Sequence, residues 1–95
     1  MESILVPEKE KMQADILLRL KKIEGQVRGI RGMVEQQRDC ADVVTQLAAV
    51  KAAVNRVGFT VLACEMETIV NKKISGGITA EEAMKEFTQV LKKFS

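Results

Sequence analysis

Apolar residues recur at alternating steps of three and four along two long stretches of this chain. In residues 10–36 the spacing is carried by Ile16, Leu20, Ile23, Val27, Ile30 and Val34. In residues 40–71 it is carried by Cys40, Val43, Leu47, Val50, Val54, Val57, Val61 and Cys64. This spacing is typical of amphipathic helices that pack along a seam. The pattern therefore predicts two long helices, over about residues 10–36 and 40–71.

Turn and capping signals separate these helices and predict a third one. Gln37-Arg38-Asp39 reads as a tight turn in which Asp39 caps the second helix. Ser75-Gly76-Gly77 is a second break, and Thr79 with Glu82 three residues later forms a capping box for a helix over about 80–94. No stretch alternates as a strand does. The predicted fold is all-α, with a long antiparallel helical hairpin followed by a short third helix.

The composition indicates that one hairpin cannot bury its own apolar surface. The chain has 95 residues, of which 46% are hydrophobic, but only three are Phe and none is Trp or Tyr. We expect a single domain, residues 1–95, with residues 1–9 as a flexible arm, and pairing of two hairpins into a four-helix bundle. Gly25 and Gly29 share one face of the first helix, where we expect close approach of another helix.

Charge and targeting signals narrow the class of protein further. The net charge of +2 is unevenly spread, since residues 10–38 and 72–95 carry the basic excess, which is compatible with an anionic partner. No apolar run approaches the length of a membrane span, and the N-terminus does not resemble a signal peptide. We expect a cytoplasmic protein with no membrane partner.

Cys40 and Cys64 are the two cysteines of a chain that has no histidine. Both lie on the apolar stripe of the second helix, about 36 Å apart along a straight helix. Antiparallel pairing of two such helices would bring Cys40 of one chain opposite Cys64 of the other, giving two dithiol sites per dimer. Cys40 begins a helix, where the dipole favours the reactive thiolate. Cys64, on an apolar stripe, is also compatible with simple packing.

Two segments carry a resemblance to a known family. They are Arg19-Leu20-Lys21-Lys22-Ile23-Glu24-Gly25-Gln26-Val27-Arg28-Gly29-Ile30 and Cys40-Ala41-Asp42-Val43-Val44-Thr45-Gln46-Leu47-Ala48-Ala49-Val50-Lys51-Ala52-Ala53. Together they resemble the CsoR/RcnR family of metal- and stress-sensing bacterial repressors, over residues 11–94. The resemblance implies a dimer of dimers that binds operator DNA and is released by an effector. It implies that Cys40 is a sensing thiol. It also implies DNA-binding roles for six basic residues: Arg19, Lys22, Lys51, Arg56, Lys92 and Lys93.

The chain departs from the family pattern at the sensing site. Copper sensors of the family carry a histidine and a second cysteine where this chain has Glu65 and Ile69, and Cys64 comes one residue before the histidine position. Persulfide sensors keep the second cysteine, and formaldehyde sensors need an N-terminal proline where this chain has Glu2. None of the three known sensing sites is therefore present as written.

These departures leave three functional hypotheses open. The first is a DNA-binding repressor released by a thiol-reactive signal, such as a persulfide, polysulfide or electrophile, at Cys40, which is bridged to Cys64 of the partner subunit. The second is a metal-responsive repressor of an efflux operon, with Cu(I) or another metal ion as effector and Cys40, Cys64 and Glu65 as ligands. The third is a helical adaptor that does not bind DNA. No cofactor is required, and the absence of histidine argues against an enzyme.

Overall fold

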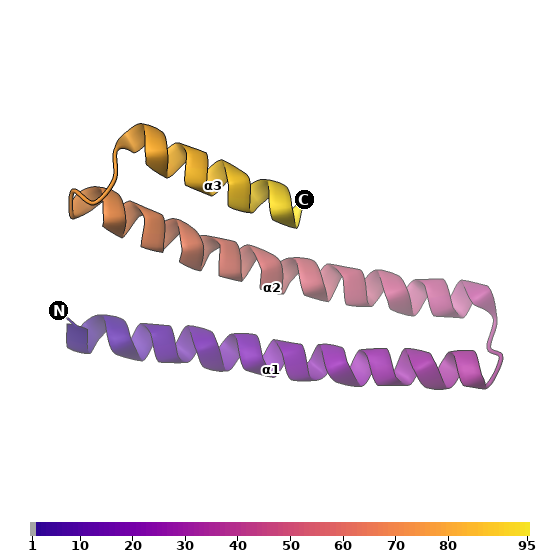
Figure 1. Ribbon diagram of the computed structural model, residues 1–95. Helices are drawn as coiled ribbons and strands as arrows, with labels where there is room; N and C mark the ends of the chain where they lie inside the picture. The colour runs from indigo at the N-terminus through magenta and orange to yellow at the C-terminus, as the bar shows by residue number, and fades with distance from the viewer. Residues whose placement is uncertain (1) are drawn as a thin grey trace. The chain divides into compact units, whose positions relative to one another are not determined.

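The computed structural model describes the backbone of residues 2–95 and the side chains of residues 10–95. It contains three helices, α1 (Glu2–Glu35), α2 (Cys40–Ile74) and α3 (Ala80–Phe94), and no strand in the described backbone (Figure 1). The predicted all-α fold and its order of elements are confirmed. The helix bounds differ, because α1 begins at Glu2 instead of Glu10 and α2 continues to Ile74 instead of Asn71. The side chains of the predicted flexible arm, residues 1–9, lie outside the described residues.

The chain divides into two compact units, Met1–Val57 and Gly58–Ser95. The first unit contains α1 and the first part of α2. The second unit contains the rest of α2 and all of α3. The two cysteines predicted to sense the effector therefore fall in different units.

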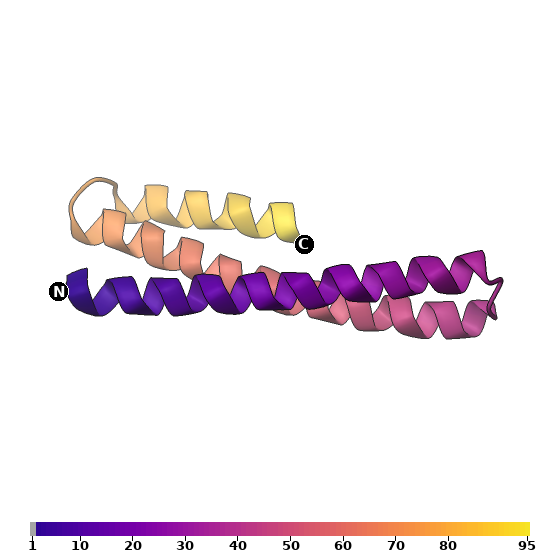
Figure 2. The same cartoon turned by 90° about the horizontal axis from the view of Figure 1, so that it is seen from below.

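A left-handed residue makes the turn of the first unit. Gln37 has a φ of 57°, and its N–H donates to the carbonyl of Val34, while the N–H of Arg38 donates to the carbonyl of Met33. This pair of hydrogen bonds is a Schellman motif, which satisfies two of the last carbonyls of α1. Asp39 follows directly before α2, and its backbone carbonyl accepts from the N–H groups of Asp42 and Val43. The predicted tight turn is thus confirmed, and Figures 1 and 2 show the helices side by side at this end.

The connection between α2 and α3 contains the glycine break and the capping box that the sequence predicts. Gly76 has a φ of 80°, which only glycine adopts readily, and the N–H groups of Gly76 and Gly77 donate to the carbonyls of Lys73 and Lys72. The Thr79 hydroxyl then accepts from the Glu82 N–H at 3.1 Å, and the Glu82 carboxylate accepts from the Thr79 N–H at 3.2 Å. The capping box is confirmed.

Packing in the second unit holds α3 against α2 at two places. Ile69 is only 3% exposed, and it lies with Met66, Ala83 and Phe87 around an apolar pocket. Near the end of α3 the ring of Phe94 packs edge-on against Phe59, with ring centroids 5.7 Å apart. An ion pair at 3.6 Å joins Lys72 of α2 to Glu86 of α3.

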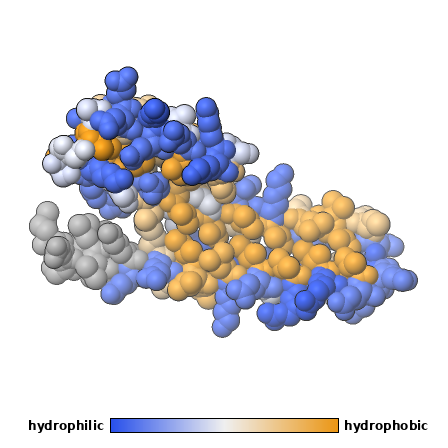
Figure 3. Space-filling view, in the orientation of Figure 1, coloured by the Kyte–Doolittle hydropathy of each residue, from blue (hydrophilic) through white to orange (hydrophobic). Residues whose placement is uncertain are grey.

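Much apolar surface stays exposed within one chain. Among the described side chains the buried hydrophobic residues are Ile23 and Val57 in the first unit and Leu62 and Ile69 in the second. Figure 3 shows hydrophobic residues gathered over α1 and the first part of α2. The exposed large aliphatic side chains of the first unit are Leu17, Leu18, Leu20, Val27, Val34, Val44, Leu47 and Val54.

The face of α1 that carries Gly25 and Gly29 is open within this chain. An added methyl group at either position would meet no atom within 4 Å, so the expected close approach of another helix stays a prediction. In addition, α2 is long and apolar enough, by length and composition, to cross a membrane, with a mean hydropathy of 1.4 over an 18-residue window. The sequence reasoning missed this because it required an uninterrupted apolar run. The 18-residue window of α2 reaches this mean hydropathy because its few charged residues do not outweigh its aliphatic ones.

Candidate functional site

Three cationic side chains converge on one cleft in the first unit. Arg19 and Lys22 of α1 and Arg56 of α2 line a cleft of about 320 Å³. Arg19, Lys22 and Gln26 share one helical face because they are spaced three and four apart. The structure therefore brings together three of the six basic residues predicted to bind DNA, from helices that are distant in sequence.

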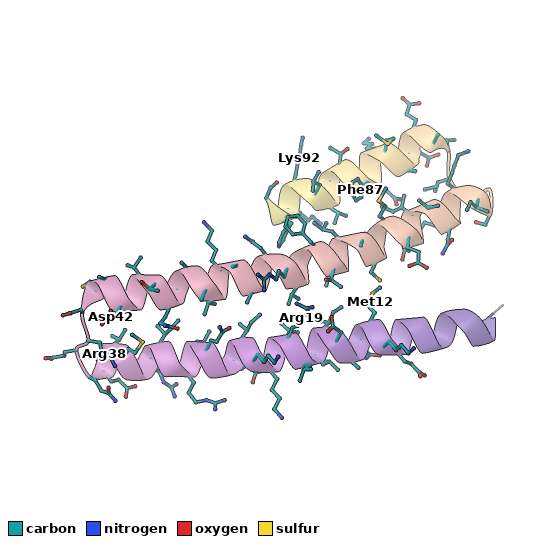
Figure 4. The ribbon with its side chains drawn as sticks, turned by 180° about the vertical axis from the view of Figure 1, so that it is seen from behind. Met12, Arg19, Arg38, Asp42, Phe87 and Lys92 are labelled. Atoms are coloured by element: carbon teal, nitrogen blue, oxygen red, sulfur yellow. The ribbon has the colours of Figure 1, made fainter. Side chains whose placement is uncertain are left out.

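An acidic side chain lines the same cleft. The Asp15 carboxylate Oδ2 accepts a hydrogen bond from Arg19 Nε at 2.9 Å, and the two side chains are 49% and 45% exposed. Figure 4 shows Arg19 extending from α1 toward α2. A pair this exposed contributes little to stability, so Arg19 can exchange Asp15 for another anion at low cost. Sequence reasoning missed Asp15 and Gln26, although the four-residue spacing of Asp15 and Arg19 signals an ion pair.

The other three predicted DNA contacts lie elsewhere. Lys51 is exposed on α2 and does not line the cleft. Lys92 and Lys93 are in the last turn of α3, in the second unit. Lys92 points away from α2 in Figure 4, whereas Lys93 lines a groove of about 590 Å³.

Cys40 is a free, exposed thiol at the first position of α2. The turn before it and the first turn of the helix are joined by an ion pair between Arg38 and Asp42, at 3.8 Å (Figure 4). The helix start is therefore held by local contacts, and the thiol itself is open to solvent. This placement leaves Cys40 accessible to a soluble reagent or metal ion.

Cys64 and Glu65 lie in the second unit, and both are half-buried. Glu65 lines the same groove as Lys93, together with Gly58 and Phe94. Ile69, at the position of the second cysteine in copper sensors, is buried against α3 instead. The structure thus leaves Cys40 exposed and Cys64 half-buried, and it buries Ile69 in the core.

No metal site is complete within the described part of a single chain. Among residues 10–95 no group of three His, Cys, Asp or Glu side chains could hold a metal ion. The predicted ligands are two thiols and a carboxylate, and the structure does not bring Cys40 together with Cys64 and Glu65 in one unit.

The helical hairpin, the capped third helix and the cationic cleft define a small all-α protein. A family model described as "metal-sensitive transcriptional repressor" matches residues 12–93. The chain belongs to this family, the CsoR/RcnR repressors. The predicted membership is confirmed, and the family is one of transcriptional repressors rather than enzymes.

Similar proteins include sensors of two metals. The chain is 45% identical over 87 residues to the copper-sensing transcriptional repressor CsoR of Bacillus subtilis (strain 168), covering 92% of this chain and 83% of that protein. A crystal structure of the copper-sensing repressor CsoR with Cu(I) from Geobacillus thermodenitrificans is 41% identical, with a TM-score of 0.75 over 90% of this chain and 88% of the other. The nickel-responsive transcriptional regulator InrS is 32% identical, with a TM-score of 0.77 over 86% and 91%.

Proposed function

We propose that this protein is a DNA-binding transcriptional repressor whose operator affinity is controlled by a metal ion. The observation that carries the DNA-binding part is the convergence of Arg19, Lys22 and Arg56 on one cleft. Arginine forks match phosphate oxygens, and neutralising phosphates releases counterions, which drives association with duplex DNA. Lys51 adds an exposed cation on α2 in the same unit, and Lys92 and Lys93 add two exposed cations on α3 in the second unit. Family membership supports this function over a helical adaptor and over an enzyme.

The repressor acts as an oligomer of identical chains. One chain leaves eight large aliphatic side chains of the first unit exposed on α1 and the first part of α2. Because exposed aliphatic surface gathered in this way is typical of an interface between chains, the proposed homodimer covers it by closing a four-helix bundle, and two dimers form the homotetramer. Covering α2 in this way also accounts for its apolar composition.

The proposed effector is Cu(I), held between two chains. Soft thiolates select Cu(I), and two thiolates satisfy it without histidine. Cys40 of one subunit and Cys64 of the partner subunit supply the thiolates, and Glu65 is the nearest additional donor in sequence. The similar repressors that sense copper support this effector, although the ligand set proposed here differs from the family pattern at Glu65 and Ile69.

One experiment tests DNA binding and metal response together. A duplex from the region upstream of the protein's own gene is titrated without oxygen, first with the reduced protein and then with Cu(I) added to the complex. We expect salt-sensitive binding that one equivalent of Cu(I) per chain reverses. Binding no tighter than to a random duplex of equal length contradicts the repressor function. Specific binding that Cu(I) leaves unchanged contradicts the metal effector alone.

A thiol-reactive signal is the second candidate, and the free, exposed thiol of Cys40 favours it. The Cys40 thiolate attacks the terminal sulfur of a persulfide, forms a Cys40 persulfide and releases the thiolate of the donor. Cys64 of the partner subunit then attacks the Cys40 sulfur and expels hydrosulfide, which leaves an interchain disulfide. Mass spectrometry after persulfide treatment tests this candidate. An unlinked chain with unchanged DNA affinity would exclude it.

A further inference from the structure

We propose that Asp15 sets the operator affinity of this repressor by competing with DNA phosphate for Arg19. This inference rests on the proposed DNA-binding function. It adds Asp15, which lowers the affinity for DNA, to the cations of the cleft, which raise it. Asp15 is the one acidic side chain among the described residues that line the cationic cleft. Its position opposes the role of the three cations around it.

The contact between the two side chains explains the competition. Arg19 Nε donates to Asp15 Oδ2 at 2.9 Å, which uses one edge of the guanidinium. A phosphate that takes two parallel hydrogen bonds from an arginine needs two donors along one edge. DNA that approaches the Nε edge must therefore displace Asp15 before Arg19 can form that paired contact.

Because both side chains are partly exposed, displacing Asp15 from Arg19 costs only a small amount of free energy. Both side chains are almost half exposed, and a surface pair at this helical spacing is worth only about a factor of two in an equilibrium constant. Asp15 also leaves a negative charge in the cleft, close to the incoming phosphate. Because several identical chains contact one operator in the proposed assembly, these small factors multiply. Asp15 thereby keeps the affinity for operator DNA low enough for an effector to release the repressor.

A second ion pair of the same kind provides a matched control. Arg31 and Glu35 on α1 are also four residues apart, with Nε and Oε1 3.7 Å from each other and exposed fractions of 73% and 68%. Neither side chain lines the cationic cleft. Glu35→Gln therefore changes the net charge as Asp15→Asn does, on the same helix, without freeing a cation of the cleft.

The test compares the affinity of the protein for the upstream duplex among five forms: unsubstituted, Asp15→Asn, Glu35→Gln, Arg19→Ala and the double variant Asp15→Asn with Arg19→Ala. We expect Asp15→Asn to tighten binding about three- to tenfold at low salt, and Glu35→Gln to change it less than about twofold. In the Arg19→Ala background, Asp15→Asn should lose most of its effect. Circular dichroism confirms that each variant is folded.

Three results would overturn the inference while leaving the repressor function in place. Binding of Asp15→Asn no tighter than that of the unsubstituted protein would mean that Asp15 does not compete. Equal gains from Asp15→Asn and Glu35→Gln would reduce the effect to net charge. A gain that persists without Arg19 would exclude competition at that residue. Failure of the unsubstituted protein to bind DNA would instead overturn the proposed function, and this inference with it.

Discussion

The ring of Phe94 lies directly over Gly58 and fills the space that a Cβ at that position would occupy. Gly58 belongs to α2 and Phe94 ends α3, so the contact joins the two helices of the second unit. The same ring packs edge-on against Phe59. The glycine inside α2, which costs about 1 kcal/mol of helix propensity, is thus explained by the close approach of an aromatic ring.

Gly58→Ala should couple energetically to Phe94. The added methyl group overlaps the ring, so the end of α3 must shift, while alanine recovers the helix propensity that glycine lacks. The two effects on the free energy of unfolding oppose each other. The prediction therefore concerns how the effect of Gly58→Ala changes when the Phe94 ring is removed. We expect Gly58→Ala to be less favourable by about 1–2 kcal/mol in the native background than in a Phe94→Ala background. Urea unfolding of the four proteins measures this coupling, and additive changes would contradict the contact.

Thr79→Ala should weaken α3 by removing one half of the capping box. The Thr79 hydroxyl accepts from the Glu82 N–H, and its loss leaves that donor without its partner from the chain. We expect a loss of about 1 kcal/mol in the free energy of unfolding. Thr79→Ser keeps the hydroxyl and should retain most of the stability. Both variants are compared at one protein concentration, since oligomers make apparent stability depend on it.

Removing a cation from the cleft should reduce both the affinity for DNA and its dependence on salt. For Arg19→Ala, Lys22→Ala and Arg56→Ala, we expect the slope of log affinity against log salt to fall by about one for each phosphate that the variant no longer neutralises. Lys85→Ala removes the same charge from an exposed position on α3 that is not among the predicted contacts. An equal reduction of the slope by Lys85→Ala would show that the cleft has no special part in binding.

A charge on the exposed apolar face should separate the proposed subunits. Leu47 is 50% exposed on α2 within one chain, and burial of a glutamate at that position would cost several kcal/mol. We expect Leu47→Glu to lower the mass of the particle in light scattering after gel filtration. Gln46→Glu adds the same charge at the neighbouring exposed position and should leave the mass unchanged. A native protein that is already monomeric would contradict the proposed assembly.

The two thiols should both be needed for the effector response. We expect Cys40→Ser and Cys64→Ser each to abolish retention of Cu(I) against a chelator that the native dimer resists, because either change leaves one thiolate per site. Glu65→Gln should reduce retention much less. Retention by Cys64→Ser equal to that of the native protein would remove Cys64 from the metal site and return it to a packing role. Neither serine variant should lose DNA affinity in the absence of effector.

Local signals in the sequence predicted the three helices and several of their ends. The spacing of apolar residues located α1 and α2, and the Gly76 break and the Thr79–Glu82 capping box correctly placed the start of α3. These features involve residues within a few positions of each other, so they depend little on the rest of the fold. The start of α1 was placed too late, because the apolar spacing that predicted this helix begins only at Ile16.

The candidate site was only partly predictable. The family resemblance selected Arg19, Lys22 and Arg56 one by one, but it did not indicate that they share a cleft or that Asp15 lies among them. It also indicated that Ile69 stands where copper sensors have their second cysteine, without showing that the Ile69 side chain is buried in the core. The pairing of Cys40 with Cys64 of the partner subunit stays a prediction.

The amino-acid sequence by itself determined the helices, the capping box of α3 and the two thiols, because helix formation and capping are governed by neighbours a few residues away. Only the tertiary structure decided that Arg56 joins Arg19 across the hairpin and that Phe94 covers Gly58. Such contacts depend on the register between helices, which the turn at Gln37 and the Gly76 connection set for residues far apart in the chain. A helix pattern repeats every few residues, so it defines a face without specifying which residue of the next helix lies opposite.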